Sequence, residues 1–145
     1  MHDAKGNAVT IDLTDDTTAR RFGATTLPVG RRAQLLALRQ QLEWCEQAVM
    51  AAQRDADRAM RNSDLSDDER WRAVQKLRAL SWKVCREVLP LISRVPPGLR
   101  DHEAYRGVEE AGHSLRRRTE DAMRDNANYA VDLVNAANDR VTARW

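Results

Sequence analysis

Aromatic side chains are scarce in this sequence of 145 residues. Phenylalanine occurs once, at Phe22, and tyrosine twice, at Tyr105 and Tyr129. A β-sandwich or barrel is usually filled by aromatic and β-branched side chains, so this composition disfavours both folds. Strong helix formers, mainly Ala, Leu, Arg, Gln and Glu, dominate residues 31–95, which favours an all-α protein.

The sequence also lacks an excess of one charge and any long apolar run. Its 24 basic and 22 acidic residues give a net charge of +2, which does not demand a nucleic acid or an anionic membrane as partner. No apolar run approaches the roughly 20 residues that span a bilayer. The acidic N-terminal region has no apolar segment of the kind found in secretory signals. We therefore expect a cytoplasmic protein without a membrane partner.

Recognisable catalytic motifs are missing as well. There is no glycine-rich phosphate loop, no dinucleotide fingerprint and no Cys-x-x-Cys pair, and no Ser or Cys stands in a known nucleophile context. Cys45 and Cys85 are expected to be buried thiols, with a disulfide or a metal site as the alternatives. Glu110 and His113 have the Glu-x-x-His spacing of di-iron bundles, but such a site needs two of these motifs. We expect no enzyme activity, no cofactor and no metal.

Alternating three- and four-residue apolar spacing predicts three long helices, at about residues 31–62, 67–92 and 100–142. Ser66 and Glu69 have the spacing of a capping box at the start of the second helix. The apolar seam of the first helix runs from large to small side chains: Leu35, Leu38, Leu42, Cys45, Val49, Ala52, Ala56 and Ala59.

Proline, glycine and asparagine interrupt the later seams. Pro90 should kink or end the second helix. In the third helix, Gly107 and Gly112 indicate either a bend or the close approach of another helix. A break there would give a closed four-helix monomer, which is the alternative to three helices. Asn126 occupies the seam, like the polar residues that fix register in coiled coils.

Residues 1–29 differ from the rest, since they are rich in Thr, Asp and Gly. Within them Val9, Ile11 and Leu13 alternate with polar residues, as in a strand, and a single strand is not stable by itself. Short connections make successive helices antiparallel. The predicted fold is therefore an all-α antiparallel bundle, coiled-coil-like and of three or four helices, over residues 30–145, with an extended N-terminal arm over residues 1–29.

Binding to a protein partner, or to further copies of the chain, is the function that this pattern favours. The third helix is longer than its two neighbours can cover, so its C-terminal half needs another surface to bury against. Exposed aromatic side chains are also common anchors at interfaces. The candidate interface residues are Val9, Ile11, Leu13, Trp44, Tyr129, Leu133, Val134, Val141 and Trp145.

Nucleic-acid binding is the second hypothesis. Basic and aromatic residues are interleaved along the second helix, and such an arrangement can hold phosphates and stack bases. The candidate residues are Trp71, Arg72, Lys76, Arg78, Trp82, Lys83 and Arg86. The favoured function is a non-catalytic adaptor, scaffold or structural subunit, and the alternative is a nucleic-acid-binding accessory protein.

Overall fold

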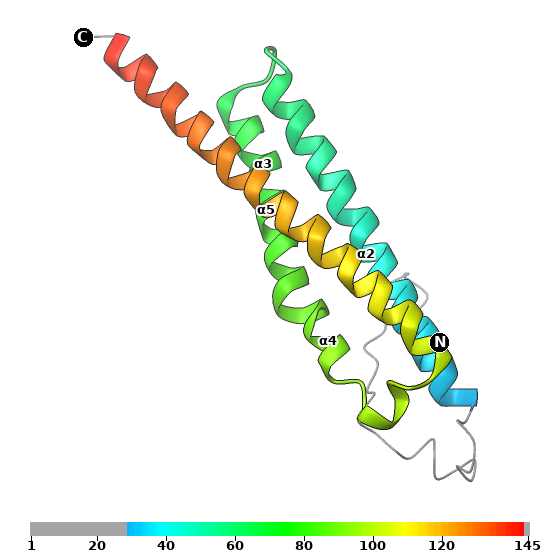
Figure 1. The fold of residues 1–145 in the computed structure, drawn as a ribbon. Coiled ribbons are helices and arrows are strands. Elements are labelled where there is room, and N and C mark those ends of the chain that lie inside the picture. The colour runs from blue at the N-terminus through cyan, green and yellow to red at the C-terminus, as the bar shows by residue number, and fades with distance from the viewer. Residues whose placement is uncertain (1–28, 144–145) are drawn as a thin grey trace.

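The computed structural model describes residues 29–143, which form a bundle of long helices (Figure 1). The elements in chain order are α2 (Val29–Arg61), α3 (Asp67–Lys83), the π-helical turn η1 (Val84–Val88), α4 (Pro90–Ser93), the 3-10 turn η2 (Pro97–Leu99) and α5 (Glu103–Ala143). No strand occurs among the described residues. The predicted all-α bundle of three long helices is confirmed, while the predicted arm lies outside the described residues except for its last residue, Val29.

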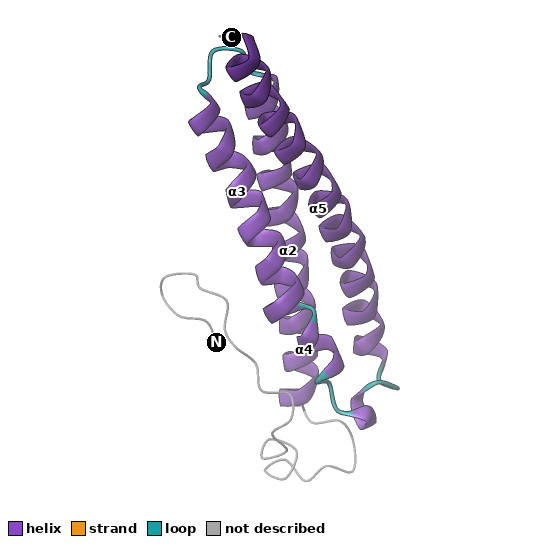
Figure 2. Cartoon of the chain, turned by 90° about the vertical axis from the view of Figure 1, so that its left-hand side faces the viewer, coloured by secondary structure: helices purple, strands orange, loops and turns teal. Residues whose placement is uncertain are grey.

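Successive long helices run antiparallel, and α5 returns alongside both of the others (Figures 1 and 2). Helix α5 is continuous over 41 residues, about 62 Å if straight. It passes through Gly107 and Gly112 without a break, so the four-helix alternative is wrong. Gly112 is buried, and a Cβ atom added to it would overlap the Cδ1 atom of Ile92 in α4. This glycine therefore marks the close approach of a neighbouring segment.

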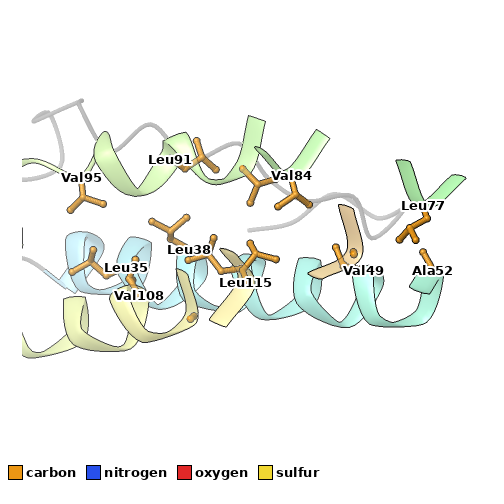
Figure 3. Packing of buried hydrophobic residues seen from close by; sticks show 14 of the residues in the cluster. Leu35, Leu38, Val49, Ala52, Leu77, Val84, Leu91, Val95, Val108 and Leu115 are labelled. Carbon is orange, nitrogen blue, oxygen red and sulfur yellow. The ribbon is translucent and has the colours of Figure 1, made fainter. Parts of the chain in front are cut away.

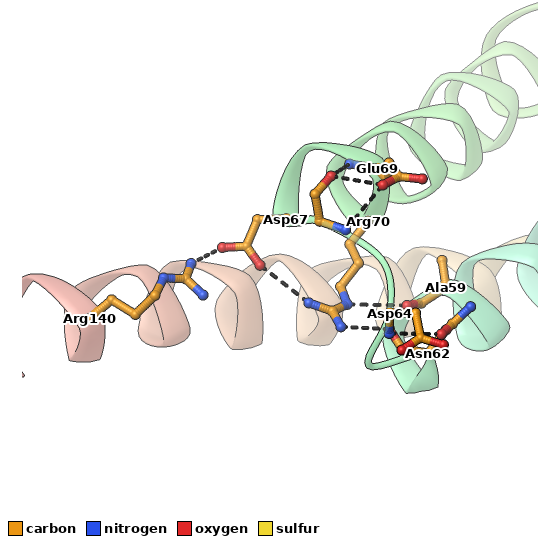
Figure 4. Close-up of polar contacts among 8 residues, drawn as sticks. Ala59, Asn62, Asp64, Asp67, Glu69, Arg70 and Arg140 are labelled. Atoms are coloured by element: carbon orange, nitrogen blue, oxygen red, sulfur yellow. Dashed lines mark hydrogen bonds and ion pairs between the residues drawn. The ribbon is translucent and has the colours of Figure 1, made fainter.

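The connection between α2 and α3 is held by side-chain caps (Figure 4). The Ser66 hydroxyl accepts the Glu69 backbone N–H at 3.2 Å, and the Glu69 carboxylate accepts the Ser66 N–H at 3.1 Å. Bonds from the Ser66 backbone and hydroxyl lower the pKa of Glu69. Arg70 donates to the carbonyls of Ala59 at 3.2 Å and Asn62 at 2.6 Å, which satisfies acceptors at the end of α2. The predicted capping box is confirmed.

The helical path continues past Pro90 by widening one turn. Proline has no N–H, and its ring would collide with the carbonyl four residues earlier in a regular α-helix. Here the Leu89 N–H instead donates to the Val84 carbonyl, five residues back, at 2.9 Å. The π-helical turn accommodates the proline, and α4 extends the path to Ser93. The predicted kink is therefore a change of helical pitch at η1.

The core follows the predicted seams (Figure 3). Its large side chains include Leu35, Leu38, Leu42, Leu77, Leu91 and Leu115. Asn126 is also buried, and its side-chain amide donates to the Val74 carbonyl at 2.6 Å. This hydrogen bond links α5 to α3 at one position, which is the register-fixing role that its place in the seam predicts.

Candidate functional site

The two cysteines are free thiols, and each is half-buried. Burial raises the pKa of Cys45, an effect that nearby Lys83 partly offsets. Burial raises the pKa of Cys85 too, with Glu120 adding to the rise and Arg116 opposing it. A thiol with a raised pKa stays protonated at neutral pH and is a weak nucleophile. The geometry therefore gives neither cysteine an activated character.

The histidines that the structure describes do not form a metal or catalytic cluster. Glu110 and His113 are both exposed, so they do not make the inward-facing pair of a di-iron bundle. Within residues 29–143, no group of three or more His, Cys, Asp or Glu side chains could hold a metal ion. His102 has a capping role, because its Nδ1 accepts the Ala104 backbone N–H at 3.0 Å just before α5 begins.

A surface depression of about 600 Å³ lies beside the start of α5. The depression borders Gly107, where Arg39 of α2 packs against the missing Cβ position. Its lining mixes charges of both signs: Arg39, Arg100, Asp101, His102, Glu103, Tyr105, Arg106, Gly107, Glu109 and Glu110.

The basic candidates of the second helix are all exposed, and together we call them the basic face. It consists of Arg72, Lys76, Arg78, Lys83 and Arg86. None of these five cations is in an ion pair within the described part of the chain. Between Glu69 and Glu87 the sequence contains six basic residues and no acidic one, and the sixth, Arg70, is held at the α2–α3 connection. The face is therefore not neutralised by ion pairs to a neighbouring helix.

A depression of about 410 Å³ lies beside two residues of the basic face, Arg78 and Arg86. Trp82 borders it with 47% of its surface exposed, while Trp71 is half-buried. Arg78 and Arg86 stand four residues before and after Trp82, so they flank the indole along the helix. Gln75 and Ala79 complete the lining, and every lining residue comes from α3 or η1.

A second surface, apolar in character, lies on the C-terminal part of α5. Among the described residues, six large apolar side chains are exposed: Leu36, Trp44, Trp82, Val131, Val134 and Val141. Three of the six fall within residues 131–141, and we call them the valine stripe. From residue 134 to residue 143 only Ala136 is even half-buried. Toward this end α5 diverges from α2 (Figure 1).

The remaining interface candidates are placed differently. Leu133 is buried inside the bundle at 3% exposure, so its prediction as an exposed interface residue is wrong. Tyr129 is half-buried, and its hydroxyl donates to the Asp57 carboxylate at 3.1 Å. Trp44 is exposed on α2, away from the valine stripe in the sequence. Val9, Ile11, Leu13 and Trp145 lie outside the described residues.

Comparison with known proteins gives no relative for this chain: no family model matches it, and no curated protein or solved structure does so either. None of the helices within residues 29–143 is both long and apolar enough to cross a membrane. Function must therefore be argued from the two surfaces themselves.

Most residues of both surfaces were predicted from the sequence, but the feature that the residues of each surface share was not. The basic face is defined by the absence of carboxylates between Glu69 and Glu87, which a charge count along the chain would have found. The valine stripe follows a second seam of three- and four-residue steps, displaced by one or two residues from the inner seam that includes Leu133. The predicted interface includes Leu133 together with Val134 and Val141, but the helix places Leu133 on a different face.

Proposed function

We propose that the protein is a non-catalytic assembly subunit that associates with a second copy of itself through the C-terminal part of α5. The observation that carries this proposal is the valine stripe. Val131, Val134 and Val141 are each about half exposed, at 56%, 48% and 56%. They share one side of a helix that the bundle has already formed, so pairing would not require the helix to fold first.

The spacing of the stripe favours another helix as the partner. Ala127, Val131, Val134, Asn138 and Val141 follow one another at steps of four, three, four and three. This is the spacing at which two helices pack knobs into holes. Ala127 and Asn138 are exposed as well, so the whole seam is available on the surface. A flat or irregular partner surface would not need this periodicity.

Two features of the seam favour a second copy arranged in parallel. Val131 and Asn138 occupy equivalent positions one heptad apart, as β-branched and asparagine residues do in parallel pairs of helices. In a symmetric parallel pair, Asn138 of one copy would face Asn138 of the other, and each amide could bond its counterpart. The seam covers only about two heptads, so we expect weak association that depends on protein concentration.

Light scattering coupled to size-exclusion chromatography tests this proposal over a range of protein concentrations. The wild-type chain should move from monomer toward dimer mass as concentration rises. A triple variant, Val131→Ser, Val134→Ser and Val141→Ser, should remain monomeric with unchanged helical content. Leu36→Ser is the matched control, because Leu36 is equally exposed on α2, and it should dimerise like the wild type. A monomeric wild type throughout, or a triple variant that still dimerises, would contradict self-association through this stripe.

A further inference from the structure

We propose that the basic face of α3 binds single-stranded nucleic acid, with the Trp82 indole stacking on a base while Arg78 and Arg86 bind flanking phosphates. This inference does not depend on the valine stripe. It goes beyond the assembly function because it gives the protein a second kind of partner on another surface.

The charge of the face identifies a polyanion as the partner. Its five cations, Arg72, Lys76, Arg78, Lys83 and Arg86, are exposed and form no ion pair with any residue of 29–143, whereas the whole chain carries a net charge of only +2. From Arg72 to Arg86 the face is about 21 Å long. Over that length one strand at duplex spacing carries about six phosphates. The cations are therefore spread over a length that suits a chain of phosphates better than a single anion.

The surroundings of Trp82 identify the partner as a nucleic acid with unpaired bases. An exposed indole offers a flat surface on which a base can stack, and every base has such a face. The 410 Å³ depression beside Trp82 provides the space, since Ala79 contributes only a methyl group there. Bases in a duplex are already stacked on one another and cannot reach this surface. An acidic protein or an anionic membrane could also contact the cations and the indole, but neither offers a base that stacks between two phosphates.

The two arginines around Trp82 suit this arrangement. A guanidinium group binds phosphate oxygens in a bidentate geometry, which an ammonium group does not. Arg78 and Arg86 lie one turn before and after Trp82, so a strand along the helix would meet phosphate contacts on both sides of the stacked base. Both side chains line the same depression as the indole.

Fluorescence anisotropy with a labelled oligothymidylate of about 20 nucleotides tests the proposal at low salt, about 50 mM. The full chain should bind this probe more tightly than a duplex of equal length, a polyglutamate or vesicles of anionic lipid. Binding should weaken steeply as salt rises, since each single-strand phosphate contact contributes about −0.7 to the slope of log K against log salt.

Substitutions at exposed positions separate stacking from charge. Trp82→Leu should weaken binding about 5- to 150-fold, the range found when a stacking aromatic is removed, and Trp82→Phe should lose much less. The control Trp44→Leu removes an equally exposed indole from α2 and should change little. Arg78→Gln with Arg86→Gln should weaken binding more than Arg58→Gln with Arg117→Gln, which removes the same charge from exposed positions on α2 and α5.

Three results would overturn the proposal: no binding at low salt, equal effects of the Trp82→Leu and Trp44→Leu variants, or equal effects of the two arginine pairs. Tighter binding to the duplex, the polyglutamate or the vesicles than to the single strand would also overturn it. Circular dichroism of each variant should match the wild type, because all the substituted side chains lie on the surface.

Discussion

At the end of the bundle where α2 begins, α2 buries large apolar side chains, whereas near the other end of α2 the side chains that it buries are small. Leu35, Leu38 and Leu42 are fully buried at the first end. Toward the second end the same seam carries Ala52, Ala56 and Ala59. We call these regions the leucine end and the alanine end.

Several polar contacts join the helices at the alanine end, and others lie nearer the middle, where the Ser114 hydroxyl donates to the Glu46 carboxylate at 2.8 Å. At the alanine end the side chain of Gln53 bonds Asp125 at 2.6 Å, Tyr129 bonds Asp57, and Asn126 bonds the Val74 carbonyl. Arg140 of α5 also pairs with Asp67 at the start of α3 (Figure 4). This difference indicates that different interactions hold the helices together at the two ends. Apolar volume supplies stability at the leucine end, and directional bonds fix how the helices lie against one another at the alanine end.

The largest expected effect is at the leucine end. Leu42→Ala should lower the free energy of unfolding by about 2–5 kcal/mol, because it removes a fully buried side chain and leaves a cavity. Urea denaturation followed by circular dichroism measures this. Leu36→Ala on the exposed side of the same helix is the control, and it should stay within about 0.5 kcal/mol of the wild type. Equal losses in the two variants would mean that the leucine end is not the stabilising region.

Replacing a small buried side chain with a large one at the alanine end should also destabilise the protein, but by less. Ala56 is fully buried where α2 carries small side chains. Ala56→Leu would force extra volume into this space, at a cost of about 1–3 kcal/mol. The same urea denaturation measures it. A neutral or stabilising result would show that the alanine end is loosely packed rather than closely packed.

Removing a cap at the turn beside the alanine end should have a smaller effect. Ser66→Ala removes the side-chain acceptor for the Glu69 N–H and should lower the free energy of unfolding by about 1 kcal/mol. Ser66→Asp is the matched control, because aspartate can accept the same bond and should keep most of the stability. A loss equal to that of Ser66→Ala would argue against the capping bond.

The smallest expected effect concerns the pH dependence of Tyr129. Burial, followed by its hydrogen bond to Asp57, raises the pKa of Tyr129 to about 12 in the folded protein, against about 10 for an ordinary tyrosine. The folded pKa is the higher one, so the contribution to stability is complete below about pH 10 and is lost as the pH rises from 10 to 12. Absorbance titration of a Tyr105→Phe variant observes Tyr129 alone. Ionisation near pH 10 in the folded state would contradict the bond to Asp57.

Much of the fold could be predicted because it depends on residues close together in the sequence. The capping box at Ser66 and the alternating spacing of the seams are local signals, and both predictions are confirmed. For Gly112 the sequence leaves open a bend or a close approach, because the outcome depends on Ile92, which the chain brings opposite only after folding. The side on which each α5 valine lies was missed for a similar reason: Leu133 and Val134 are neighbours in the sequence but face opposite environments.

The valine stripe lies on the C-terminal part of α5, where few side chains are buried. A helix end with few buried apolar contacts opens more readily than the core of the same helix. If a second copy covers the stripe, this part of α5 should become more protected as the protein concentration rises. Hydrogen exchange followed by mass spectrometry, at a low and a high protein concentration, measures both properties on one sample.

We predict that amides of residues 131–141 exchange faster than those of residues 108–122 at low concentration, and that only the former slow down at high concentration. Exchange that is equally slow along all of α5, or that does not depend on concentration, would contradict assembly through the C-terminal part of α5.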